Sequence, residues 1–255
     1  MTSLRVFIVT EDDPLYVKKF FEIFFSECPR DEVTLSGMII SRAFHESIWR
    51  TARRIHRFYG TFNFIRLGLR YMLAKVLRAD IQQLARKRGV PIFRAVSVND
   101  PSFVAQLRTM RIDLLVSVAA PEVFQSPLLQ VARLGSINIH SGRLPKYRGM
   151  MPTFWQMRHG ESEVAITIHE MAEKIDAGGV IATRSLALKP HDTLDRVIVE
   201  TKREGARAMI EVLRQTAEQG KLPVAQPLDM TQASYFRFPD PENVRAFHAR
   251  GYRLL

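Results

Sequence analysis

The 255-residue sequence contains a single cysteine, Cys28. One thiol cannot close a disulfide within the chain or supply the ligands of a cysteine-rich zinc site, so the fold has to rest on its hydrophobic core. The sequence also lacks any run of about 20 apolar residues, the length that a membrane-spanning helix needs. The first apolar run, residues 4–10, precedes three acidic residues, which is the wrong order for a secretory signal. We therefore expect a cytoplasmic protein.

Acidic residues are almost absent from one segment, residues 42–78. It contains nine Lys or Arg residues and one acid, Glu46, and so carries +8 of the formal net charge of +11. The basicity is therefore local. One interpretation is a helix that buries Ile48, Ala52 and Ile55 and exposes Arg50, Arg54 and Arg57 to solvent. The others are a peripheral contact with an anionic membrane and a phosphate-binding surface for a nucleotide-sugar or RNA.

Segments rich in aliphatic residues alternate with amphipathic helical segments along the chain. We expect strands at residues 4–10, 33–41, 91–96, 114–119 and 136–140, with helices between them. This order predicts an α/β fold, a doubly wound, mostly parallel sheet with helices on both faces. Two more strands (163–171 and 180–188) and a long helix (193–219) follow.

The same pattern suggests the domain organisation. We expect one catalytic domain over residues 1–220 and a short C-terminal tail over residues 221–255.

Within the basic segment, Gly60 interrupts the helical periodicity. An apolar stripe then resumes at Phe62, Ile65, Leu69, Leu73 and Val76.

Polar residues lie where the fifth expected strand ends. Because side chains alternate along a strand, Asn138 and His140 share one face, about 6.5–7 Å apart. A strand buried on both faces does not normally carry two polar side chains, and parallel sheets bind ligands beyond the carboxyl ends of their strands. From these two residues alone, a hydrogen-bonded pair at the end of the sheet is the simpler explanation.

An acid follows in a glycine-rich turn, at Asp176. Asn, His and Asp together suit acyl transfer to an amine. A carboxamide can donate to a developing oxyanion, and an imidazole can polarise a carbonyl and move a proton. A carboxylate can fix the state of the imidazole and help to deprotonate an amine through water.

Residues 138–149, Asn-Ile-His-Ser-Gly-Arg-Leu-Pro-Lys-Tyr-Arg-Gly, together with Ile-Asp-Ala-Gly at 175–178, resemble the signature of the folate-dependent formyltransferases. In that family Asn-x-His precedes Leu-Pro-x-x-x-Gly and an Asp in a later turn. Three elements in the right order make the resemblance specific. It implies a Rossmann-like fold, 10-formyltetrahydrofolate as the formyl donor, no metal, and Asn138, His140 and Asp176 as catalytic residues. One departure is Gly142, where the family often has Ser.

The resemblance also implies where the donor and the substrate bind. The pterin would lie between residues 120–125 and 171–176, against backbone groups of both segments. The donor-binding candidates are Glu122, Val123, Phe124, Gln125, Ala172 and Lys174. The substrate-binding candidates are Lys146, Tyr147, Arg148 and Trp155, and a core position for Trp155 is an equal alternative.

The amine that accepts the formyl group is not specified by these motifs. The loop at residues 10–14 is acidic and lacks glycine, which disfavours the phosphate of glycinamide ribonucleotide. Residues 152–155 and 160–171 look most like the amino-sugar formyltransferases, so a nucleotide-linked amino sugar of surface polysaccharide or lipid biosynthesis is the preferred acceptor.

Three alternatives to an amino-sugar enzyme stay open. The basic segment favours methionyl-tRNA formylation, although only 35 residues follow Gly220, where those enzymes carry a further domain. A hydrolase that releases formate from the same folate is a second alternative, and a catalytically inactive basic adaptor is a third. A homodimer and peripheral membrane association remain compatible with the enzyme.

Overall fold

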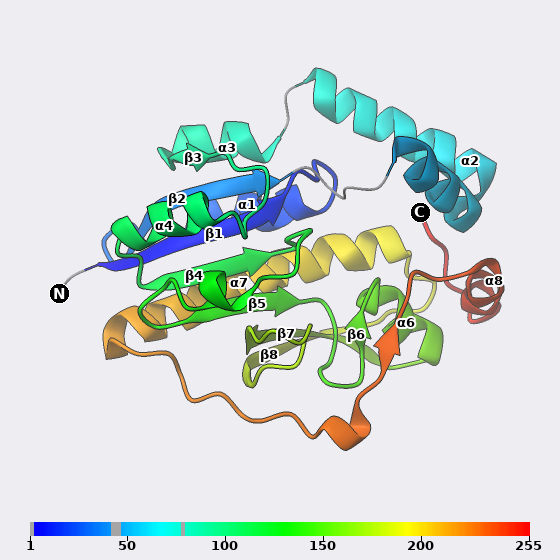
Figure 1. The fold of residues 1–255 in the computed structure, drawn as a ribbon. Helices are drawn as coiled ribbons and strands as arrows, with labels where there is room; N and C mark the ends of the chain where they lie inside the picture. Colours follow the sequence, from blue (N-terminus) through cyan, green and yellow to red (C-terminus); the bar gives the residue numbers. More distant parts are fainter. Residues whose placement is uncertain (1–2, 42–46, 78–79) are drawn as a thin grey trace.

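The computed structural model describes residues 3–41, 47–77 and 80–255 (Figure 1). Its main sheet has seven strands in the order β3-β2-β1-β4-β5-β7-β8. These strands are β1 (Leu4–Glu11), β2 (Val33–Ser41), β3 (Ile92–Phe93), β4 (Leu114–Val118), β5 (Ser136–His140), β7 (Glu163–Glu170) and β8 (Val180–Ala187). The first five run parallel, while β7 is antiparallel to β5 and to β8. The mostly parallel sheet predicted from the sequence is confirmed.

Helices cover both faces of the sheet, and the alternation of side chains in β1 shows why. Val6 and Ile8 face a core that also contains the apolar faces of α1 (Val17–Glu27), α3 (Ile81–Arg88) and α7 (Leu194–Gln219). Phe7 and Val9 face the opposite core, under α4 (Pro101–Thr109) and α5 (Ser126–Leu129). Both faces of the strand are buried, as in other doubly wound sheets.

The basic segment forms helix α2 (Ile48–Val76), which breaks at Gly60 as predicted. Gly60 has φ 72° and ψ 167°, a conformation that favours glycine. Before the break, Phe58 and Tyr59 are buried. After it, the apolar stripe that begins at Phe62 is turned away from the core.

Of the three arginines of α2 that were predicted to be exposed to solvent, one is not. Arg50 and Arg57 are exposed, but Arg54 points inward and its guanidinium lies 5.0 Å from the ring centre of Phe238. Its inclusion in the solvated face was wrong, because Arg54 lies on the side of the helix that carries the buried residues. Arg42, Arg78 and the side chain of Ile48 lie outside the described residues.

The C-terminal segment, predicted to be a short tail, packs as part of the fold. β9 (Tyr235–Phe236) pairs with β6 (Arg148–Gly149). Helix α8 (Pro241–Ala249) buries Phe247, which stacks on Phe154 of α6 (Pro152–His159) at 4.9 Å. The prediction missed this helix, although Asp240 caps its start, Pro241 begins it and Val244 and Phe247 lie at helical spacing. None of the described helices is both long and apolar enough to cross a membrane.

Candidate active site

The sheet brings Asn138, His140 and Asp176 to one edge. Asn138 and His140 lie in the last three residues of β5, while Ile137 and Ile139 pack into the core that also contains Val6, Ile8 and the apolar face of α7. Asp176 lies in the loop between β7 and β8, where its φ of 50° is in the left-handed region. His140 Nδ1 is 3.7 Å from Asp176 Oδ2, and both side chains are nearly buried. The imidazole and the carboxylate are therefore close enough to share a proton through a small movement or one water.

Backbone groups hold the imidazole and the carboxylate in place. His140 Nε2 lies 2.6 Å from the carbonyl oxygen of Tyr147, to which it donates, so that Nδ1 is the nitrogen that faces Asp176. The backbone N–H of Gly149 donates to Asp176 Oδ2 at 3.1 Å. Arg148 holds the same loop, because its guanidinium donates to the carbonyl of Ile175. The rigid loop at residues 142–149 thus positions both groups.

A second histidine, His169, completes the site. Its Nδ1 donates to the carbonyl of Glu170 at 2.7 Å, and its Nε2 lies 3.1 Å from Asn138 Nδ2 and 3.7 Å from Asp176 Oδ1. Burial, reinforced by the neighbouring His140, lowers the pKa of His169 to about 4. The ring is therefore neutral at pH 7, and its Nε2 accepts a hydrogen bond from Asn138. Sequence reasoning missed this residue, because its role depends on the register of β5 against β7.

Two cavities meet at these residues. One, of about 280 Å³, lies between residues 120–124 and 171–176; the other, of about 580 Å³, lies between the end of β1, α2 and the start of α6. Both are lined by Asn138 and Asp176, and His140 lines the larger one. The smaller cavity corresponds to the segments predicted to hold the pterin. Two ligands could therefore approach the same carboxamide and carboxylate from different sides.

The donor-binding candidates divide into two groups. Glu122, Val123, Phe124 and Ala172 line the smaller cavity, whereas Gln125 and Lys174 do not. The side chain of Asn99 donates to the carbonyl of Val123 and accepts from the N–H of Gln125, so it fixes the shape of this wall. Lys174 is exposed on the opposite loop.

The four substrate-binding candidates do not line either cavity. Tyr147 is fully buried, and its hydroxyl donates to Glu161, which also pairs with Lys146. Trp155 stacks on Phe236 and donates to the carbonyl of Arg237, which is the core position considered above. Arg148 supports the Asp176 loop, as described. All four side chains contact other residues of the protein, and their role as substrate contacts stays a prediction.

The cavity of about 580 Å³ has an acidic wall. From the sequence, these acidic residues were used only to argue against a phosphate-binding loop. Glu11, Asp12 and Asp13 line the cavity, together with Lys202. Burial and the nearby Asp13 raise the pKa of Glu11 to about 7. Burial lowers the pKa of Lys202, although Glu11 and Asp13 oppose that shift. Tyr16, Tyr59 and Tyr71 also line this cavity, as do Arg54 and Ile55 of α2.

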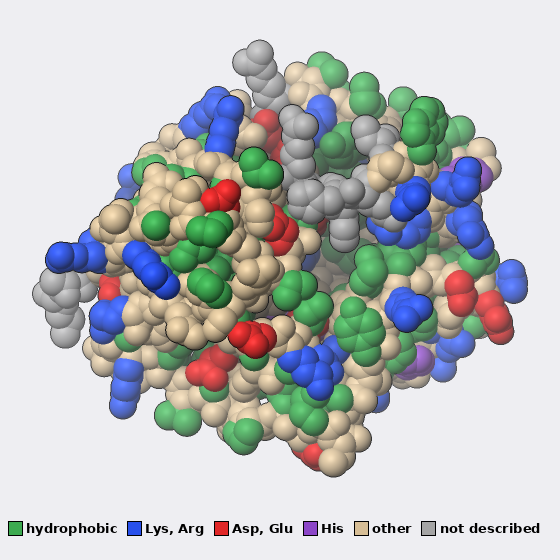
Figure 2. All heavy atoms as spheres, viewed as in Figure 1, with side chains coloured by type: hydrophobic (Ala, Val, Ile, Leu, Met, Phe, Trp, Pro, Cys, Tyr) green, Lys and Arg blue, Asp and Glu red, His purple; other side chains and the backbone are tan. Residues whose placement is uncertain are grey.

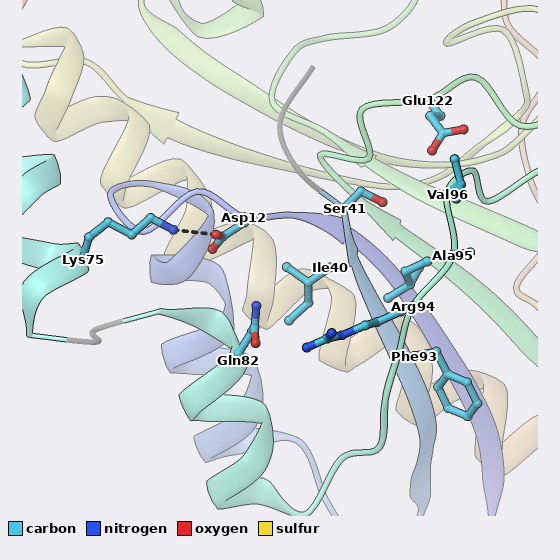
Figure 3. A pocket seen from close by; sticks show the side chains of 11 residues that line it. Asp12, Ile40, Ser41, Lys75, Gln82, Phe93, Arg94, Ala95, Val96 and Glu122 are labelled. Atoms are coloured by element: carbon cyan, nitrogen blue, oxygen red, sulfur yellow. Dashed lines mark hydrogen bonds and ion pairs between the residues drawn. The ribbon is translucent and has the colours of Figure 1, made fainter. Parts of the chain in front are cut away.

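A third cavity, of about 690 Å³, lies beyond the Lys75–Asp12 ion pair, at the carboxyl ends of β2 and β3 (Figure 3). Asp12 also lines the cavity of about 580 Å³ and Glu122 also lines the cavity of about 280 Å³, so this space adjoins both. Arg94 contributes the other cation of its lining. In the part of the chain that the structure describes, no group of three or more His, Cys, Asp or Glu side chains is placed to hold a metal ion.

Residues 71–213, more than half of the sequence, match the family model described as formyl transferase. The chain belongs to this family. A methionyl-tRNA formyltransferase from Anaeromyxobacter sp. strain K is 35% identical over 161 residues, which cover 63% of this chain and 51% of that protein. The homologous enzyme from Geobacter metallireducens is 34% identical over 134 residues, or 50% and 43% of the two chains. This formyl transferase chain thus spans about half the length of the curated relatives it matches.

Solved structures of formyl transferases share the fold. Glycinamide ribonucleotide transformylase 1 from Symbiobacterium toebii superposes with a TM-score of 0.62 at 18% identity, over 89% of this chain and 95% of that one. A sugar N-formyltransferase from a Shewanella species gives a TM-score of 0.58 at 18% identity, over 97% and 87% of the two chains. At this level of identity the two structures support the fold.

Proposed function

We propose that this chain transfers the formyl group of 10-formyltetrahydrofolate to a primary amine. The observation that best supports the proposal is the meeting of two cavities at Asn138 and Asp176, with His140 beside them. The smaller cavity takes the pterin of the donor and the larger one takes the acceptor. The formyl carbon then lies at their junction.

Each of the three side chains has one task in this reaction. The amine nitrogen attacks the formyl carbon, and the carbonyl oxygen gains negative charge. Asn138 donates one N–H to His169 and has a second N–H for that oxygen. Asp176 accepts the amine proton through water, and His140, whose Nδ1 faces that carboxylate, relays the proton onward. The bond from carbon to N10 of the folate then breaks, N10 takes the proton that Asp176 had accepted and His140 relays, and the products are a formamide and tetrahydrofolate.

We propose a nucleotide-linked amino sugar as the acceptor. The carboxyl groups of Glu11, Asp12 and Asp13 suit an ammonium group and disfavour a phosphate beside them, whereas Arg54 brings positive charge to the α2 wall of the same cavity, where a diphosphate could bind. The fold neighbour from Shewanella is a sugar N-formyltransferase. A nucleotide-linked amino sugar carries both an amine and a diphosphate, and the lining of this cavity supports it as the acceptor.

Methionyl-tRNA is the second candidate acceptor. The relatives that are 34–35% identical are methionyl-tRNA formyltransferases, and Arg50, Arg53 and Arg57 are exposed on α2, where they could contact phosphates.

The acceptor can be identified by a screen that measures tetrahydrofolate formation from 10-formyltetrahydrofolate. The acceptors are nucleotide-linked amino sugars with the amine at different ring positions, and charged initiator tRNA. The proposal predicts turnover with at least one amino sugar and none with its N-acetylated form, and Asp176→Asn should abolish it. Turnover with the tRNA alone would favour the second candidate. Release of formate without any amine would indicate a hydrolase.

A further inference from the structure

Helix α2 carries an apolar face that no described residue covers. Six large apolar side chains after the break at Gly60 are between 56% and 78% exposed. They are Phe62 (78%), Ile65 (56%), Leu69 (66%), Met72 (61%), Leu73 (59%) and Val76 (73%). Monomeric proteins rarely expose a continuous apolar patch larger than a few hundred Å², and such patches mark contact surfaces.

The spacing of these residues makes them one stripe. At 3.6 residues per turn, all six fall within an arc of about 100° of the helix. Leu67 and Tyr71 lie on the other side of the same helix and line the acceptor cavity. The second half of α2 is thus apolar on two sides, of which only one faces the protein.

Positive charge accompanies the stripe. Arg66 is exposed beside it, and Arg50, Arg53 and Arg57 are exposed on the first half of the helix, next to Trp49, which is 84% exposed. The sequence contains no Asp or Glu between residues 48 and 76. Figure 2 shows hydrophobic and basic side chains together over the region of α2, at the upper right of the view in Figure 1.

We infer that the exposed surface of α2, comprising the apolar stripe after Gly60 and the four exposed arginines on the two sides of the break, docks onto an anionic lipid surface. A helix with one apolar face, exposed cations and no acid is the type that lies in a membrane interface, with its apolar residues among the acyl chains and its arginines at the headgroups. A second copy of the chain is a less favourable partner, because its own α2 would bring arginines against the arginines of the first copy. Docking through α2 places one wall of the acceptor cavity at the membrane.

The inference is tested by sedimentation of the 255-residue chain with phosphatidylcholine vesicles, with and without phosphatidylglycerol. We expect binding to the mixed vesicles only, and a decrease in binding as salt increases. Equal binding to both, or to neither, would refute the inference. This assay requires no acceptor amine, so its outcome is independent of the proposed reaction.

Two variants separate the contributions of charge and apolar surface. Arg50→Gln/Arg53→Gln/Arg57→Gln should weaken vesicle binding by roughly fivefold per charge, or about a hundredfold in all. Leu69→Gln/Met72→Gln should abolish penetration of the acyl region, measured as quenching of Trp49 fluorescence by brominated lipid. None of these side chains lines the two cavities that meet at Asn138, so turnover with an amino-sugar acceptor in the absence of vesicles should not change in either variant.

The matched control is Arg86→Gln/Lys87→Gln/Arg108→Gln, which removes three exposed cations from α3 and α4. It has the same net charge as the arginine variant and should bind vesicles like the unmodified protein. If the control and the arginine variant lose vesicle binding equally, binding depends on net charge and not on α2, and the inference is refuted. Sedimentation velocity without lipid tests whether a second copy of the chain covers the stripe instead. A stable dimer that Leu69→Gln/Met72→Gln dissociates would assign the stripe to a second copy and overturn the inference.

Discussion

Asn138 and His169 face each other across β5 and β7, and Nδ2 of Asn138 lies 3.1 Å from Nε2 of His169. The low pKa of His169 keeps its ring neutral, and its Nδ1 is engaged by the carbonyl of Glu170. Its Nε2 is therefore an acceptor, which fixes the rotation of the Asn138 amide. We therefore propose that His169 positions the carboxamide that acts on the formyl group.

Replacing this acceptor should lower the rate of the chemical step. We expect His169→Ala to decrease kcat by roughly tenfold, because Asn138 loses its fixed orientation and one oxyanion donor is weakened. The KM for the folate should change little, since the cavity wall remains. The measurement is steady-state kinetics, with His159→Ala as a control outside the cavities. An unchanged kcat would remove His169 from the site.

Gly142 should not tolerate a side chain, although relatives often have Ser at this position. A Cβ atom there would lie 2.8 Å from His140 Nε2 and 2.9 Å from the carbonyl oxygen of Tyr147, the two atoms that form the hydrogen bond holding the imidazole. Gly142→Ala should therefore lower kcat at least tenfold and shift the histidine resonances in NMR spectra. Normal activity in this variant would show that the imidazole does not depend on that hydrogen bond.

The raised pKa of Glu11 predicts a pH dependence of stability. A carboxyl group whose pKa rises from 4.5 to about 7 on folding binds more protons in the folded state between these values, so the free energy of unfolding falls as pH rises through this range. Relative to Glu11→Gln, the unmodified protein should lose up to about 3 kcal/mol between pH 5 and 8. Urea unfolding at both values measures the difference, with exposed Glu218→Gln as a control. If Glu11→Gln and the unmodified protein lose stability in parallel, Glu11 is ionised throughout.

The sequence was most informative where a local pattern determines the structure. β5 begins and ends at the predicted residues, and the break at Gly60 was read correctly, because alternation and periodicity are local properties. The position of His169 opposite Asn138 depends on strand register, and the outward direction of the stripe on α2 depends on which side of the helix meets the protein. Neither is encoded in a short segment, so neither could be predicted.

The packing of the C-terminal segment against α6 also depends on residues distant in the sequence, so it could not be predicted either. Its contribution to stability can be measured. Phe247 is fully buried against Phe154, so Phe247→Ala should destabilise the protein by about 3–5 kcal/mol. Urea unfolding measures this loss. A detached tail would give a change within about 0.5 kcal/mol, as exposed substitutions usually do.

The most direct test of the central claim is the rate of formyl transfer in Asn138→Ala, measured with the acceptor that the screen identifies. If Asn138 donates to the oxyanion, kcat falls by roughly 10²–10³ while the dissociation constant of the folate changes little. His140→Ala and Asp176→Asn should be similarly impaired and remain folded by circular dichroism. A kcat close to that of the unmodified protein in Asn138→Ala would contradict the account.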